Sequence, residues 1–141
     1  MFKYLHHVHY VVRNRDEMVN YFVKNFGMTP SQQGITKPDP RFPYQSEVAF
    51  AYYDVGNTQI QMTEPLDPSS NMGKRLATQG AGIWHVAWAV DNIQKVSEDL
   101  VANGNKLRGE GSTKEDTPRG YQVINIDHNS SHGLRLQLVG V

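Results

Sequence analysis

Four side chains that can bind a metal ion or hold a substrate recur along the chain: His7, Gln61, His85 and Gln137. Each lies inside an apolar stretch. Imidazole nitrogens and amide oxygens can both bind divalent metal ions, and imidazole suits the later transition metals. A single histidine or glutamine in a strand is more often structural than functional. The spacing of the four residues therefore carries the argument.

The spacing indicates an internal duplication. A shift of 78 residues places residues 5–12 on residues 83–90, and His7 on His85. Gln61 follows His7 by 54 residues, and Gln137 follows His85 by 52. Two copies of one unit would each provide a histidine and a glutamine. A pseudo-twofold relation between the copies would bring the four side chains to one point.

Strands must position these residues. In residues 83–90, strand alternation places His85, Ala87 and Ala89 on one face, and the two tryptophans with Val86 on the other. Residues 5–12 have the same β-branched and aromatic character. A helix follows each strand, at residues 16–26 with Asn14 or Asp16 as its cap, and at residues 92–103.

The remaining segments complete each copy. In the first copy, the sequence predicts a short strand around residues 30–33 and a hairpin of strands 47–55 and 59–63. A short helix from Ser69 or Ser70 to Gly80 follows. In the second copy, it predicts a polar loop over residues 109–120 near the mouth of the site and a closing hairpin of strands 121–126 and 134–139.

The composition narrows the class of protein. Fourteen basic and fourteen acidic residues among 141 leave no net charge to attract nucleic acid or anionic lipid. No long apolar run predicts a membrane span, and no signal-peptide pattern is present, so we expect a cytoplasmic protein. The chain has no cysteine, so any metal site must use nitrogen and oxygen ligands.

Four motifs resemble the vicinal oxygen chelate superfamily, which includes glyoxalases and bleomycin-resistance proteins, and within it the methylmalonyl-CoA epimerases. They are Leu-His-His-Val at 5–8, Val-Gly-Asn-Thr-Gln-Ile-Gln-Met-Thr-Glu-Pro-Leu at 55–66, Gly-Ile-Trp-His-Val-Ala at 82–87 and Gly-Leu-Arg-Leu-Gln-Leu-Val at 133–139. The resemblance implies an α+β fold in which two βαβββ repeats form a U-shaped mixed sheet around a central site. The whole chain, 1–141, would be one domain, with modules 1–66 and 81–141 joined by a connector at 67–80.

The resemblance also implies a set of functional residues. His7, Gln61 and His85 match positions that bind one divalent ion, which can be Zn, Co, Mn, Ni or Fe. Gln137 stands where the family normally has a glutamate, so the chain departs from the pattern there. Glutamine can still coordinate through its amide oxygen, but it cannot take up a proton at neutral pH. Glu47 matches a catalytic glutamate in a neighbouring strand.

These expectations lead to an enzyme hypothesis and to alternatives. The first hypothesis is a metal-dependent isomerase or epimerase that stabilises the enolate of a carbonyl or CoA-thioester substrate. A lactoylglutathione-lyase-like enzyme and a dioxygenase are alternatives, although a dioxygenase normally needs a ligand carboxylate. A third is a non-catalytic binding or resistance protein that holds an aromatic ligand with Trp84, Trp88, Tyr52 and Tyr53. We expect a small-molecule substrate and a homodimer.

Overall fold

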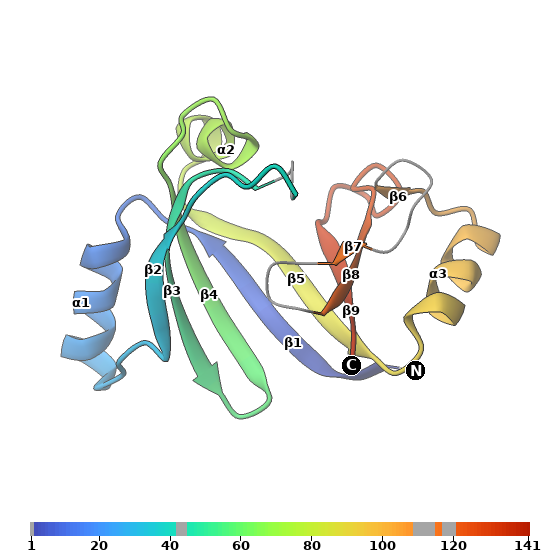
Figure 1. Ribbon diagram of the computed structural model, residues 1–141, viewed down its shortest axis with the longest axis horizontal. Helices are drawn as coiled ribbons and strands as arrows, with labels where there is room; N and C mark the ends of the chain where they lie inside the picture. Colours follow the sequence, from blue (N-terminus) through green and yellow to red (C-terminus); the bar gives the residue numbers. More distant parts are fainter. Residues whose placement is uncertain (1, 42–44, 109–114, 117–120) are drawn as a thin grey trace. The chain divides into compact units, whose positions relative to one another are not determined.

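The computed structural model describes residues 2–41, 45–108, 115–116 and 121–141. Figure 1 shows the secondary-structure elements in order along the chain. They are β1 (Phe2–Val11), α1 (Arg15–Phe26), β2 (Gln32–Thr36), β3 (Val48–Val55), β4 (Thr58–Pro65), α2 (Asn71–Gln79), β5 (Gly82–Val90), α3 (Ile93–Ala102), β6 (Leu107–Arg108), β7 (Glu115–Asp116), β8 (Gln122–Ile126) and β9 (Leu136–Gly140).

The order of elements repeats once. β1, α1 and β2 to β4 form the first copy, and after α2 the chain continues with β5, α3 and β6 to β9. The predicted α+β fold with two βαβββ repeats is confirmed. The second copy differs in its short strands β6 and β7, of two residues each, which both pair with β8.

Two predicted segments have different bounds in the structure or are described only in part. The strand expected around residues 30–33 is β2, which begins at Gln32 and ends at Thr36. Of the polar loop expected over residues 109–120, residues 109–114 and 117–120 lie outside the described residues. Glu115 and Asp116 form β7.

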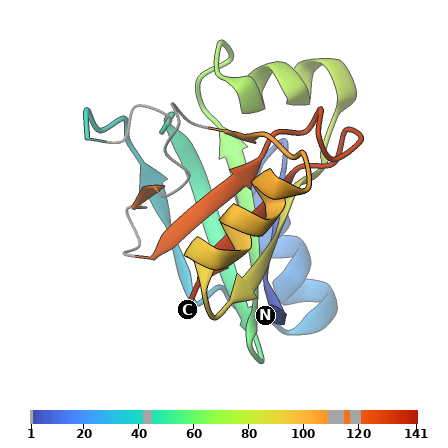
Figure 2. The ribbon, with the colours of Figure 1, turned by 90° about the vertical axis from the view of Figure 1, so that its right-hand side faces the viewer.

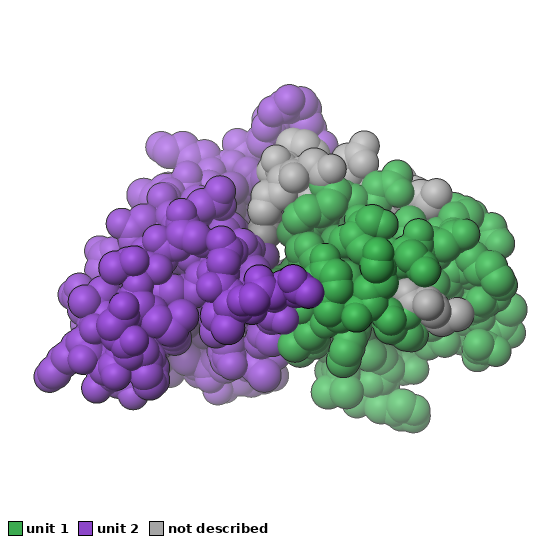
Figure 3. Space-filling model, turned by 90° about the horizontal axis from the view of Figure 1, so that it is seen from below, with its two compact units in different colours: residues 1–7, 85–141 green, residues 8–84 purple. Residues whose placement is uncertain are grey.

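The chain divides into two compact units, coloured separately in Figure 3. Unit 1 contains Met1–His7 and His85–Val141, and unit 2 contains Val8–Trp84. Strands β1 and β5 therefore contribute residues to both units. As a consequence, His7 and His85 belong to the same unit although 77 residues separate them in the sequence.

Unit 2 is an antiparallel sheet covered by α1. β3 pairs with β2 and with β4, and Gly56 at positive φ closes the predicted hairpin between β3 and β4. Asn14 caps α1 by accepting a hydrogen bond from the Glu17 N–H, and Gly27 ends the helix in the left-handed conformation. Met18 and Phe22 of α1 pack against buried residues of the sheet: Val12, Ala51, Tyr53 and Met62.

Unit 1 contains the strand that carries His85. β5 pairs with β9 in parallel, and β8 is antiparallel to β9 on its other side. α3 lies across β8 and β9 (Figure 2) and buries Ile93 and Val96 against Ile124 and Leu138. Asn92 caps this helix by accepting a hydrogen bond from the Lys95 N–H. Among the residues that the structure describes, no helix is long and apolar enough to cross a membrane.

Candidate metal centre

His7 and His85 meet in unit 1. His7 is 1% exposed on β1, and His85 is half-buried on β5. Their Nε2 atoms are 2.8 Å apart, and their rings meet at an interplanar angle of 62°. At this distance one Nε2 must carry a proton and donate it to the lone pair of the other. The structure thus brings together the two histidines that the internal repeat relates.

The separation of the two nitrogen atoms suits a shared metal ion. Two imidazole nitrogens, each about 2.1 Å from an ion, lie about 3.0 Å apart at a ligand–metal–ligand angle of about 90° and about 3.4 Å apart at the tetrahedral angle. Only a small adjustment of the observed 2.8 Å is needed. Within the described residues, no group of three or more His, Cys, Asp or Glu side chains could hold a metal ion. Amide oxygens of the described residues are further candidate donors for a site at this pair.

Gln137 shares the sheet face of His85. It lies on β9 opposite Ala87 of β5, and strand alternation puts Ala87 on the same face as His85. Gln137 Nε2 donates a hydrogen bond of 3.0 Å to Oδ1 of Asn125, its partner on β8. Because the nitrogen end of the amide is engaged, Oε1 is the atom that can bind an ion. The side chain is 9% exposed.

Gln61 is oriented in a comparable way within unit 2. It is fully buried on β4, and its Nε2 donates to Gln59 Oε1 at 2.9 Å. Gln59 in turn donates from its Nε2 to Asp54 Oδ1 at 3.0 Å. Gln61 Oε1 is buried and has no hydrogen-bond partner among the described residues. A buried acceptor without a partner is costly, so this oxygen fits the role of a ligand to an ion or a polar group.

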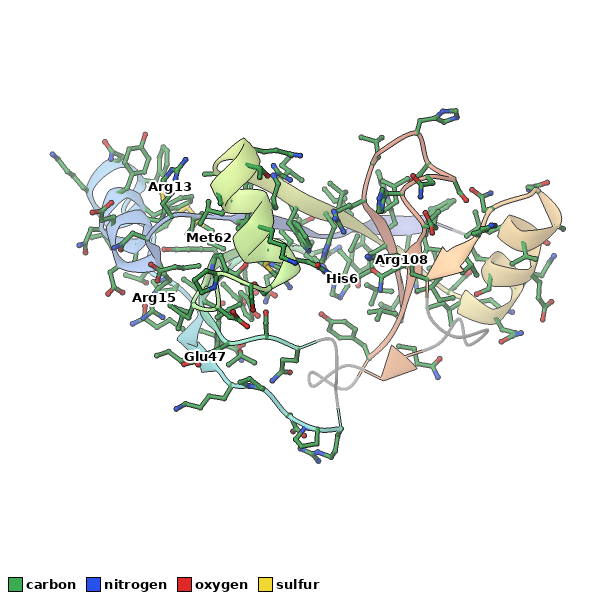
Figure 4. The ribbon with its side chains drawn as sticks, turned by 90° about the horizontal axis from the view of Figure 1, so that it is seen from above. His6, Arg13, Arg15, Glu47, Met62 and Arg108 are labelled. Carbon is green, nitrogen blue, oxygen red and sulfur yellow. The ribbon has the colours of Figure 1, made fainter. Side chains whose placement is uncertain are left out.

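Glu47 lies on the segment that leads into β3 (Figure 4) and is half-buried. Its backbone carbonyl accepts a hydrogen bond from the Leu66 N–H at 2.9 Å, which ties the start of β3 to the end of β4. Glu47 and Gln61 both belong to unit 2. Their participation in a site with His7 and His85 stays a prediction.

The other histidines have different surroundings. His9 is buried in unit 2, where its Nε2 is 2.7 Å from Thr63 Oγ1. His128 and His132 lie in the turn between β8 and β9, and His132 is exposed. His6, labelled in Figure 4, is the functional candidate that sequence reasoning missed, because its Nδ1 is 2.8 Å from His7 Nδ1. The His-His pair at 6–7 is the signal that could have indicated it.

The four aromatic residues considered as a ligand-binding set do not share one face. Trp84 and Trp88 alternate with His85 and so lie on the opposite face of β5. Tyr53 is buried in the core beneath α1, where its ring stacks on Phe22 with centroids 4.8 Å apart. Burial raises the pKa of the Tyr53 phenol. Tyr52 pairs with Gln61 across β3 and β4, on the other side of that sheet.

Solved structures of methylmalonyl-CoA epimerases resemble this chain along nearly its whole length. The Mycobacterium tuberculosis enzyme superposes with a TM-score of 0.81 at 24% sequence identity, covering 99% of this chain and 88% of that one. A selenomethionine-containing methylmalonyl-CoA epimerase gives a TM-score of 0.78 at 25% identity, with 99% and 96% coverage. A methylmalonyl-CoA epimerase in complex with methylmalonyl-CoA and NH4+ gives 0.79 at 17% identity, with 99% and 95% coverage.

A search of curated proteins found no match to the sequence. The family comparison matches residues 6–123, which include His7, Gln61 and His85 and both helices that follow the repeated strands. This match spans well over half of the chain. The chain therefore belongs to the glyoxalase/bleomycin resistance protein/dioxygenase superfamily.

Proposed function

We propose that this protein is a divalent-metal-dependent isomerase or epimerase that acts on a carbonyl or CoA-thioester substrate through an enolate. One observation carries the proposal: the approach of His7 and His85, whose Nε2 atoms are 2.8 Å apart. The similarity to epimerases supports the reaction class, and the complex of one of them with methylmalonyl-CoA supports a thioester substrate.

The ligand set consists of neutral side chains. His7 and His85 would hold the ion through Nε2, and Gln61 and Gln137 through their amide oxygens. When bound, the ion supplies a Lewis acid that polarises a substrate carbonyl. Because none of the four ligands is charged, the set leaves the full charge of the ion in place. We expect weaker metal binding than with a carboxylate ligand and stronger polarisation of the substrate.

Glu47 is proposed as the general base. Its carboxylate would take the proton from the carbon next to the carbonyl, and the electron pair of that C–H bond would delocalise into the carbonyl to form the enolate. Return of a proton to the opposite face inverts the carbon centre. Gln137 cannot provide that proton, because a primary amide is not an acid at neutral pH. A second proton donor is therefore required for epimerisation.

Metal content of protein purified without chelator is the first test of this proposal. We expect one equivalent of a divalent transition metal in the wild type and loss of stoichiometric metal in both His7→Ala and His85→Ala. His132→Ala, which alters an exposed histidine of the β8–β9 turn, is the matched control and should keep its metal. A full equivalent in both His7→Ala and His85→Ala would contradict the ligand assignment.

The second test addresses the reaction. We expect a 2-methyl-3-oxo thioester or a related 2-substituted malonyl thioester to incorporate deuterium from solvent at the α-carbon in the presence of the metal-loaded enzyme. Glu47→Gln should slow this exchange by about two orders of magnitude or more while leaving metal content unchanged. Exchange at the wild-type rate in Glu47→Gln would show that Glu47 is not the base. If the protein binds such thioesters without metal and catalyses no exchange, the proposal of an enzyme would fail. The alternative of a non-catalytic binding protein would then be favoured.

A further inference from the structure

His6 makes a direct contact with a candidate metal ligand. Its Nδ1 is 2.8 Å from Nδ1 of His7, and the two rings meet at an interplanar angle of 75°. His7 uses its other nitrogen, Nε2, toward His85. The three imidazoles form a chain inside unit 1, in which His7 is in contact through both of its nitrogens.

Two tyrosines hold the His6 ring in place. Tyr121, the residue before β8, meets it edge-on with centroids 5.0 Å apart. Tyr4, two residues earlier on β1, lies nearly parallel to it, with centroids 6.4 Å apart. Tyr121 is itself packed against a buried cluster of Ala87, Val123 and Val139. The position of His6 therefore depends on the packed interior of unit 1.

The direction of the hydrogen bonds along this chain decides whether His7 can bind an ion. A hydrogen bond between two Nδ1 atoms needs one donor and one acceptor. If His6 donates, the proton of neutral His7 is on Nε2, and that nitrogen cannot coordinate. If His7 donates, its proton is on Nδ1, and its Nε2 presents a lone pair that can coordinate an ion.

We infer that His6 is a positioning residue that accepts a hydrogen bond from His7 Nδ1 and thereby holds His7 in the tautomer and ring orientation needed for metal binding. This inference rests on the proposed metal-binding function. Metal-ligating histidines generally donate their second ring N–H to an acceptor that fixes the ring. The usual acceptor is a carboxylate, a backbone carbonyl or water, and here an adjacent imidazole takes that place.

Two substitutions of His6 distinguish the contribution of its ring from that of its acceptor atom Nδ1. His6→Phe keeps an aromatic ring for Tyr4 and Tyr121 but removes Nδ1. His6→Asn loses the ring but places an acceptor oxygen close to the position of Nδ1. We expect His6→Phe to weaken binding of Zn²⁺ or Co²⁺ by about 10- to 100-fold, measured by competition with a chelator, because loss of such partners has effects of that size. His6→Asn should stay within a few-fold of wild type.

Equal weakening in both variants would overturn the inference, because the ring and not the acceptor would then matter. Wild-type affinity in His6→Phe would overturn it as well. Thermal unfolding of the metal-free variants provides the folding control. A merely structural role for His6 would lower the melting temperature, but the metal affinities of His6→Phe and His6→Asn would then be equal.

A measurement without metal distinguishes failure of this inference from failure of the proposed function. Long-range ¹H–¹⁵N spectra of metal-free protein report the tautomer of each histidine, and the His7 signals are identified by their loss in His7→Ala. We expect His7 to carry its proton on Nδ1 in the wild type and to lose this preference in His6→Phe. A wild-type His7 protonated on Nε2 would overturn the inference. Absence of any Zn²⁺ or Co²⁺ binding by the wild type would instead contradict the proposed function.

Discussion

Gln137→Glu changes the one proposed ligand that departs from the pattern implied by the resemblance to the epimerases. In the metal-free protein the substitution removes the N–H that Gln137 donates to Asn125 and places a carboxylate at a site that is 9% exposed. With the present orientation of Asn125, two oxygens would face each other. A half-turn of the Asn125 amide would present its nitrogen instead and restore one hydrogen bond. The remaining cost is the dehydration of the carboxylate, on the order of several kcal/mol for a buried ion.

Metal binding should oppose this destabilisation. A charged ligand in place of a neutral one is expected to tighten binding at least tenfold, which corresponds to about 1.4 kcal/mol. At a free metal concentration about 100 times the dissociation constant, binding stabilises the folded state by about 2.7 kcal/mol, and tenfold tighter binding raises this to about 4.1 kcal/mol. The metal-free variant should therefore be less stable than wild type, whereas the metal-saturated variant should recover about 1.4 kcal/mol of the difference.

Two assays measure these quantities. Competition with a chelator gives the metal affinity, and thermal or urea unfolding with and without metal gives the stabilities. Asn125→Asp is the matched control, because it adds the same charge at the neighbouring position on β8 while leaving the amide of Gln137 in place. Equal tightening in both variants would indicate a general charge effect, and unchanged affinity in Gln137→Glu would show that the side chain does not reach the ion. Either result would refute the assignment of Gln137 as a ligand.

Three further substitutions test the packing and helix capping of the fold. Tyr53→Phe should leave the free energy of unfolding unchanged or raise it, because the Tyr53 hydroxyl is buried without a hydrogen-bond partner among the described residues. Burial raises the pKa of Tyr53 above its ordinary value of 10.0, so its folded-state pKa exceeds the unfolded one. Wild type should therefore lose stability relative to the variant as the pH rises above about 10. Urea unfolding of both proteins at two pH values checks this. A difference in the free energy of unfolding that stays constant with pH would contradict it. Gly73→Ala should lower the free energy of unfolding by about 1–3 kcal/mol in urea titrations, since a Cβ there would meet the Asp67 carbonyl oxygen and, at 2.9 Å, Pro68 Cα; wild-type stability would show that this loop moves aside. Asn92→Ala removes the acceptor for the Lys95 N–H at the start of α3 and should lower the melting temperature by an amount equivalent to about 1 kcal/mol, whereas no change would show that the cap is dispensable.

The sequence by itself determined the repeated order of elements and the ends of the helices. These features depend on local chemistry: Asn14, Ser70 and Asn92 each accept a hydrogen bond from the N–H three residues ahead, and Gly27 adopts a positive φ that other residues avoid. The pairing of His7 with His85 as equivalent positions also followed from the sequence, because a duplication preserves the place of a residue within its unit.

Only the tertiary structure decided how the candidate ligands are oriented. The amide of Gln137 is fixed by Asn125 across the β8–β9 pair, and the ring of His7 is in contact with His6 and His85. Adjacent residues of a strand normally point to opposite faces, so alternation alone predicts that His6 and His7 turn away from each other. The choice of side-chain rotamers, set by packing against Tyr121 and His85 from distant parts of the chain, brings their Nδ1 atoms together. Such contacts depend on strand register and rotamers, which no local spacing in the sequence specifies.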